Sequence, residues 1–139
     1  MTGRTLSVLV GLSVLTLSFA CSIPTEGVPM TVKIQEQQLE ADELALWPTT
    51  PEINGGFELT VRGIMYFGCE TPIAYAALNG SVVTVRVSRR SGDPDRCRAI
   101  TTGWHGYELT LPGLPDGWYD VVVREDGKPG QYRERVRIS

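Results

Sequence analysis

Hydrophobic and polar residues alternate along most of the chain after residue 30. Every second residue is apolar in residues 107–111, and the same period of two runs through residues 83–87 and 136–138. This alternation predicts half-buried antiparallel strands. The strands are expected at residues 30–38, 57–63, 82–88, 97–101, 107–111, 118–124 and 131–138. Clusters of glycine, proline, asparagine and aspartate between them predict turns, and the single helix candidate is residues 36–46.

Seven short strands in about a hundred residues predict an all-β fold, a β-sandwich. In such a fold, the apolar residues of each strand face the second sheet and form the core. The expected core is the alternating apolar set together with two residues of the segment 112–119: Val32, Ile34, Phe57, Leu59, Val61, Val83, Val85, Val87, Leu109, Leu111, Leu114, Tyr119, Val121, Val123, Val136 and Ile138.

Residues 114–123 (LPDGWYDVVV) resemble the tyrosine corner of immunoglobulin-like and fibronectin type III-like sandwiches. In that motif, a tyrosine near the start of strand F hydrogen-bonds to the backbone just before it. The resemblance implies that Tyr119 is this tyrosine and that Leu114 fills the core beside it. It also implies a single immunoglobulin-like antiparallel sandwich over residues 30–139. Pairing of the last two strands is then expected to place Asp120 opposite Arg133 and Trp118 opposite Arg135.

The first twenty residues have a different pattern. Arg4 precedes an apolar run, from Leu6 to Ala20, that only glycine, serine and threonine interrupt. A short basic start, an apolar run and a small residue at its end are typical of an export signal. The run is shorter than the roughly 20 residues that a membrane-spanning helix needs. We therefore expect residues 1–20 to be a signal peptide and the protein to be exported.

The end of this leader, Ala20-Cys21, resembles the lipobox of bacterial lipoproteins, in which cleavage before a cysteine precedes lipid attachment. The resemblance implies that Cys21 is lipidated, that residues 21–29 form the anchor and tether, and that the lipid holds the protein in a membrane. Ser22 implies sorting to the outer membrane, facing the periplasm, if the source is Gram-negative. Leu17 and Phe19 depart from the pattern. Cleavage by an ordinary signal peptidase, which leaves a soluble secreted protein, is the alternative.

The three cysteines support export. Cys69 and Cys97 can form a disulfide in an oxidising compartment, which leaves Cys21 as the odd cysteine that a lipid accounts for. Such a bridge stabilises by roughly 3–4 kcal/mol in the chain-entropy model. In the expected topology the two cysteines follow strands that end at opposite ends of the sandwich. The bridge therefore requires residues 69–80 to fold back along the sandwich.

Composition and motifs argue against several classes of function. The formal net charge of −3 makes a nucleic-acid partner unexpected, because that affinity comes largely from neutralising phosphates. His105 is the only histidine and no nucleophile motif accompanies it, so we expect no catalytic residues and no enzyme. Two cysteines and one distant histidine lack the spacing of a metal site, and neither a metal nor another cofactor is expected. Acidic residues gather in residues 22–60, where Lys33 is the only basic residue.

Aromatic residues in the loops suggest a binding surface. Loops that share one end of an immunoglobulin-like sandwich are expected to carry a candidate binding patch formed by Tyr66, Phe67, Trp104 and His105. Asp126 and Lys128 of the last turn, and the tether, are expected at the same end. The patch would bind an envelope protein or a glycan; alternatively, the four residues cover the end of the core.

The sequence therefore predicts a non-enzymatic lipoprotein of the cell envelope that acts as a binding or structural module. The second hypothesis is a carbohydrate- or peptide-binding accessory domain, secreted or anchored, that uses the loop aromatics.

Overall fold

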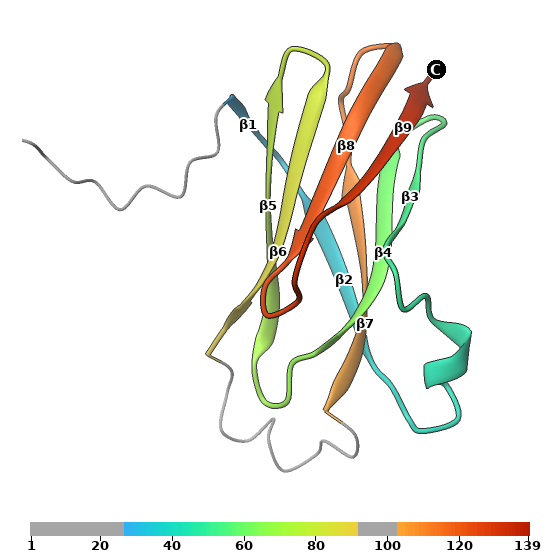
Figure 1. Ribbon diagram of the computed structural model, residues 1–139, viewed down its shortest axis with the longest axis vertical. Helices are drawn as coiled ribbons and strands as arrows, with labels where there is room; N and C mark the ends of the chain where they lie inside the picture. Colours follow the sequence, from blue (N-terminus) through green and yellow to red (C-terminus); the bar gives the residue numbers. More distant parts are fainter. Residues whose placement is uncertain (1–26, 92–102) are drawn as a thin grey trace, which may run out of the picture.

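The computed structural model describes residues 27–91 and 103–139, which form two packed β-sheets (Figure 1). The order in the first sheet is β1 (Val28–Met30), β5 (Thr71–Asn79), β6 (Val82–Arg90), β8 (Gly117–Glu125) and β9 (Tyr132–Ile138). The order in the second is β2 (Lys33–Gln38), β7 (Trp104–Leu111), β4 (Leu59–Tyr66) and β3 (Glu52–Asn54). A short 3-10 helix, η1 (Leu44–Leu46), lies between β2 and β3. The predicted all-β sandwich is confirmed.

The core lies between the sheets, where the alternating residues of the long strands meet. Leu59 and Val61 of β4 and Leu109 of β7 are fully buried against the valines of β6 and β8. Burying each such side chain stabilises the fold by about 1.5–3 kcal/mol relative to leaving it exposed. Most of the expected core residues are buried as predicted.

Strand β5 is a long element that the sequence pattern misses, and the short strand β3 was not predicted either. Pro72 and a run of alanines blur the alternation in residues 71–79, although Ala76 and Ala77 are buried. The strand runs back along the sandwich from the end where β4 finishes, and it forms a hairpin with β6 through a turn in which Gly80 has φ = +61°. Residues 69–80 thus fold back as the predicted disulfide requires.

This added strand reverses the direction of β6 relative to the immunoglobulin-like expectation. β6 and β8 pair in parallel, with Val83 opposite Val121, in a sandwich whose other described pairs between named strands are antiparallel. An immunoglobulin-like sandwich has its first, second and fifth strands in one sheet and its third, sixth and seventh in the other. The structure keeps this partition, because residues 30–38, 57–63 and 107–111 fall largely in one sheet and residues 82–88, 118–124 and 131–138 in the other. The order differs, since β2 pairs with β7 and not with β4. The predicted strand at 97–101 lies outside the described residues.

Two expected core residues are exposed. Phe57 is 89% exposed because it lies in the β3–β4 turn, before the start of β4. Ile34 is 36% exposed because β2 is an edge strand that the other sheet covers only partly.

The register of the last hairpin also differs from the expectation. Asp120 lies opposite Arg135, and Trp118 lies opposite Arg137, which is a shift of two residues along β9. The shift arises because β9 begins only at Tyr132, so the turn after Glu125 is longer than the Asp126-Gly127 turn that the sequence suggests.

The corner before β8 has the geometry that the resemblance implies. The hydroxyl of Tyr119 donates a hydrogen bond of 2.6 Å to the carbonyl oxygen of Pro115, and the ring of Tyr119 is buried. Leu114 is half-buried and packs against the core. The bond ties the β7–β8 connection to the first residues of strand β8.

We expect the substitution Tyr119→Phe to lower the free energy of unfolding by about 0.5–1.5 kcal/mol, because it removes one hydrogen bond and keeps the ring. Urea denaturation of the two proteins measures the difference. Unchanged stability would show that this bond contributes nothing to the corner.

The two ends of the sandwich carry different elements. The chain enters the described part at the upper end in Figure 1, where Val28 pairs with Leu78 beside the β5–β6 turn. Tyr66 and Trp104 pair with each other at the lower end, where β4 finishes and β7 begins. The expectation that the tether and the aromatic patch share one end is therefore wrong. The reason is that β1 pairs with the final residues of β5. The expected signal peptide, Cys21 and most of the tether lie outside the described residues.

Candidate functional site

The structure divides the expected aromatic patch into an exposed pair and a buried pair. Tyr66 is 53% exposed and Trp104 is half-buried, and their rings meet edge to face with centroids 5.6 Å apart. Both side chains project from the same face of the second sheet, because they form a cross-strand pair. This is the outer face, since the neighbouring pair of Met65 and His105 points into the core. These two aromatic residues form the outward-facing part of the expected patch at the lower end.

Phe67 and His105 are buried, and placing them in a binding patch was wrong. Phe67 is 3% exposed and His105 is 0% exposed, and their rings meet edge to face with centroids 5.5 Å apart. β7 begins at Trp104 and not at residue 107, so the alternation that buries Tyr107 also turns His105 inward. The Nδ1 atom of His105 lies 3.2 Å from Oε2 of Glu36. The two residues close the lower end of the core.

A buried carboxylate lies at the end of β8, beside this closed core. Glu125 is 1% exposed, and it accepts hydrogen bonds from the hydroxyl of Tyr107 at 2.9 Å and from Nζ of Lys128 at 3.1 Å. Burial is the main cause that raises the pKa of Glu125, and the hydrogen bonds from Lys128 and Tyr107 oppose the rise. Burial beside this carboxylate also raises the pKa of Tyr107 far above its usual range. Glu125 is inaccessible, and both its oxygens accept hydrogen bonds from the protein itself.

Lys128 links the β8–β9 turn to β4. Its ammonium group donates a hydrogen bond of 2.8 Å to the backbone carbonyl of Ile64. The pairing between β3 and β4 ends at Glu52 opposite Arg62. Ile64 lies beyond this point, where β4 has no partner strand among the described residues on the β3 side. Pro51 precedes the ladder and has no N–H group to extend it. Lys128 therefore lies at a free sheet edge, where a lysine also discourages edge-to-edge aggregation.

An ion pair holds this turn in place. Arg86 of β6 binds Asp126 through two hydrogen bonds of 2.9 Å, and the hydroxyl of Ser88 adds a third of 2.6 Å. The hydrogen bonds from Arg86, followed by that from Ser88, lower the pKa of Asp126 against the opposing effect of burial. The charged form of Asp126 thus fixes the start of the turn two residues before Lys128.

A pocket of about 440 Å³ opens between this turn and the outer face of the second sheet. It is bounded by apolar and aromatic groups and by one cation: Leu44, Thr49, Ile64, Trp104 and Lys128. Its size and mainly apolar lining with few polar groups are typical of ligand sites. Lys128 has three donor hydrogens, and the described contacts use two of them.

The segment 39–51, termed the covering segment, forms the outer wall of this pocket. Leu39 is 1% exposed, and its N–H donates to the carbonyl oxygen of Trp104 at 2.9 Å. The ring of Trp47 lies directly on Gly106, where a Cβ atom would come within 2.6 Å of it, and the guanidinium of Arg62 lies 4.1 Å from its centroid. These contacts hold the covering segment on the sheet and place Leu44 and Thr49 at the pocket.

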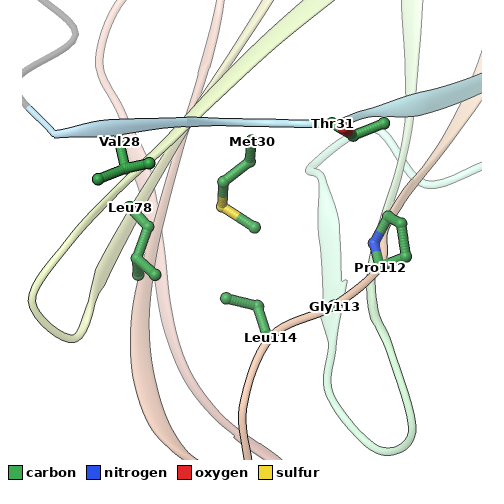
Figure 2. Close-up of a pocket in the computed structure, with 7 residues that line it drawn as sticks. All are labelled: Val28, Met30, Thr31, Leu78, Pro112, Gly113 and Leu114. Carbon is green, nitrogen blue, oxygen red and sulfur yellow. The ribbon is translucent and has the colours of Figure 1, made fainter.

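A second pocket, of about 360 Å³, lies at the upper end between the β1–β2 link and the β7–β8 connection. Figure 2 shows Met30 and Leu114 pointing toward each other across it, with Leu78 beside them. Its lining is mainly apolar and includes no charged side chain. Leu114 thus borders this pocket as well as the core.

The cysteines are only partly described. Cys69 lies in the link between β4 and β5 at the lower end. Cys97 and Cys21 lie outside the described residues, so the Cys69–Cys97 bridge and the lipidation of Cys21 stay predictions.

Of the residues that line the pocket, the sequence pointed to Trp104 and Lys128 and missed the other three. Ile64 follows the expected strand 57–63 and is not in the expected core; it faces outward and is buried beneath the pocket. Leu44 and Thr49 lie in a segment without periodicity. The one available signal is Trp47-Pro48, an aromatic residue beside a helix-breaking residue in an otherwise acidic stretch.

In residues 27–91 and 103–139, no group of three or more histidine, cysteine, aspartate and glutamate residues is arranged to hold a metal ion. The same residues contain no helix that is long and apolar enough to cross a membrane. No protein-family model, no curated protein and no solved structure matches the chain.

Proposed function

We propose that the chain is a non-enzymatic lipoprotein of the cell envelope and that the pocket at Trp104 and Lys128 is its binding site. The observation that carries this proposal is the pocket itself, which combines an aromatic wall, apolar walls and one lysine. It lies at the lower end of the sandwich, away from the point where the chain enters at Gly27. An anchor at Cys21 would therefore leave the pocket free to meet a partner.

The partner that suits this chemistry is an envelope protein that inserts an apolar side chain. Ile64 and Leu44 supply apolar contact, and the remaining N–H of Lys128 suits an acceptor such as a backbone carbonyl of the partner. The exposed ring of Tyr66 extends the surface beside Trp104. A glycan that stacks on these two rings is the second candidate, favoured by the exposure of Tyr66 alone. No nucleic acid is proposed as a partner.

Binding is favoured over catalysis because the ionisable groups beside the pocket are occupied. Glu125 is buried with both oxygens hydrogen-bonded, and Lys128 is held by that carboxylate and by a backbone carbonyl. A general acid or base must instead reach the proton that it transfers.

The binding site is tested by capture from native envelopes with the intact protein and two aromatic-to-alanine variants. We expect Trp104→Ala to lose the captured partner, and Phe57→Ala, which changes an exposed aromatic residue in the β3–β4 turn, to retain it. Thermal melts of both variants accompany the capture. A fall in stability of roughly 3–5 kcal/mol for Trp104→Ala would instead assign the residue to the core. Equal loss of partner in both variants would contradict the pocket.

The anchor is tested separately. We expect Cys21→Ser to abolish metabolic labelling with fatty acid and to change the membrane fractionation of the protein. Normal cleavage and unchanged membrane fractionation of this variant would reject the lipoprotein assignment and favour the soluble secreted alternative.

The disulfide between Cys69 and Cys97 is part of the proposal. Thr71 pairs with Arg90, and the N–H of Phe67 donates to the carbonyl oxygen of Gly103 at 3.0 Å. Both ends of the segment that contains Cys97 are therefore attached near Cys69. Mass mapping without reduction is expected to join the two cysteine peptides, and free thiols at both positions would reject the bridge.

A further inference from the structure

The outer face of the first sheet is basic, although the protein as a whole is acidic. Side chains of β9 that share the side of Trp118 are arginines: Arg133, Arg135 and Arg137. Arg124 projects from the same face of the neighbouring β8, next to Arg86 of β6. We call the four residues Arg124, Arg133, Arg135 and Arg137, together with Trp118, the basic face.

The arginines of the basic face are available to a partner. All four are exposed, and within residues 27–91 and 103–139 none forms an ion pair. Two acidic residues lie near them. Asp120 lies opposite Arg135, but the guanidinium of Arg135 lies over the ring of Trp118, 5.3 Å from its centroid. Asp126, which interacts electrostatically with Arg124, is already paired with Arg86. Acidic residues instead lie around the outer side of the second sheet, at Glu108, Glu52 and the covering segment. The charge is thus divided between the two sides of the molecule.

The basic face extends to the end at which the chain enters. Trp118 and Arg137 are at the upper end, where β8 begins and β9 finishes (Figure 1). From Cys21 to Gly27 the chain can span at most about 20 Å, even when fully extended. An anchor at Cys21 therefore keeps this end near the membrane. Exposed arginine beside tryptophan suits the headgroup level of a bilayer, where amphipathic rings and basic side chains gather.

We infer that the basic face docks on the surface of an anionic bilayer and so orients the anchored protein. The inference rests on the proposed lipid anchor. Guanidinium groups of the basic face pair with headgroup phosphates, and Trp118 lies at the boundary between headgroups and acyl chains. Docking in this way leaves the second sheet, with the Trp104 pocket on its outer face, directed away from the bilayer.

Protection of an edge strand explains only part of this arrangement. Charged residues on an edge strand such as β9 discourage pairing with another chain. Arg124 and Trp118 lie on β8, which has neighbours on both sides, so this role does not account for them.

The test uses the full-length protein with vesicles of phosphatidylethanolamine, with or without phosphatidylglycerol. Flotation with the vesicles reports attachment. An arginine-specific dicarbonyl reagent, read by mass spectrometry, reports which guanidinium groups are covered. We expect arginines of the basic face to be protected only in the vesicles that contain phosphatidylglycerol, and salt to remove the protection. Arg62, on the opposite side, is expected to label equally in both.

Two matched variants sharpen the result. Arg133→Gln/Arg137→Gln is expected to lower the ratio of docked to undocked protein about thirtyfold, because each basic side chain near an anionic surface contributes about a factor of five. Arg124 then labels as it does in neutral vesicles. The control Lys33→Gln/Arg62→Gln removes the same charge from the opposite sheet and is expected to leave the protection of Arg124 unchanged.

The outcomes separate this inference from the anchor. Protein that floats on both vesicles but labels equally in both overturns the basic face and leaves the anchor standing. Flotation only with anionic vesicles, and loss of this flotation in the Arg133→Gln/Arg137→Gln variant, would support the basic face and reject the anchor. Flotation on neither rejects both. Stronger protection by a soluble polyanionic glycan than by vesicles would overturn the choice of a bilayer as partner.

Discussion

Replacing Lys128 by methionine is expected to lower the free energy of unfolding by about 3–5 kcal/mol at neutral pH. The substitution leaves the carboxylate of Glu125 buried without its cation, and an uncompensated buried charge has a cost of this size. It also removes the hydrogen bond to the carbonyl of Ile64 at the free edge of β4. Urea denaturation of the wild-type and Lys128→Met proteins measures the difference.

The cost is expected to depend on pH in a defined direction. Burial raises the pKa of Glu125 in the folded state above its unfolded value, so the folded protein binds this proton more tightly. The contribution of this group to stability is full below the unfolded pKa. It is lost as pH rises through the folded pKa. Loss of Lys128 raises the folded pKa further, and the penalty of Lys128→Met should shrink as the pH is lowered and Glu125 becomes neutral.

The double variant Glu125→Gln/Lys128→Met is the control for this interpretation. Glutamine keeps an acceptor for the hydroxyl of Tyr107 and carries no charge. The double variant should therefore be more stable than Lys128→Met alone at neutral pH. A loss below 1 kcal/mol for Lys128→Met, or a loss that is the same at every pH, would show that Glu125 does not depend on Lys128.

The buried carboxylate and the pocket are connected through one short turn. Arg86 fixes Asp126, Glu125 holds Lys128 from inside, and Lys128 forms part of the pocket and reaches the edge of β4. The hydrogen bonds from Lys128 to the carbonyl of Ile64 and from Tyr107 to Glu125 join the two sheets at the lower end, and the pair of Arg86 and Asp126 holds the turn on the first sheet. The position of the lysine in the proposed binding site is thus determined by residues that never touch the ligand.

The sandwich was predictable because alternation is a local property. Residues 83–87 and 107–111 each carry a clean period of two, and their apolar positions are buried as expected. The tyrosine corner was predictable for the same reason, since the bond from Tyr119 to Pro115 spans four residues. Strand β5 was missed because alanine and proline conceal its alternation, and this strand determines the direction of β6.

The candidate site was only partly predictable because it depends on long-range pairing. Lys128 and Ile64 are 64 residues apart in the sequence, and their contact exists only where β3 ends and leaves the edge of β4 open. The burial of His105 depends on where β7 begins, which the turn-like sequence before residue 107 does not reveal. The end at which the tether enters depends on the pairing of β1 with β5, a strand that was not predicted.

The neighbouring residues Tyr66 and Phe67 provide the sharpest test of how the lower end divides. Tyr66 is the last residue of β4 and is 53% exposed, whereas Phe67 turns back into the core and is 3% exposed. We expect Phe67→Ala to lower the free energy of unfolding by about 3–5 kcal/mol, because it opens a cavity beside His105.

Tyr66→Ala is the matched variant, one residue away and also aromatic. It removes an edge-to-face contact with Trp104 at the surface, and its expected cost is about 0.5–1.5 kcal/mol. The order reverses for binding: Tyr66→Ala should weaken partner capture at the Trp104 pocket, and Phe67→Ala should reduce capture only in proportion to the protein that unfolds. Denaturant midpoints and capture at a temperature where both variants are folded measure the two effects. Equal losses of stability would mean that the lower end of the sandwich has no separate core layer beneath its exposed aromatic surface.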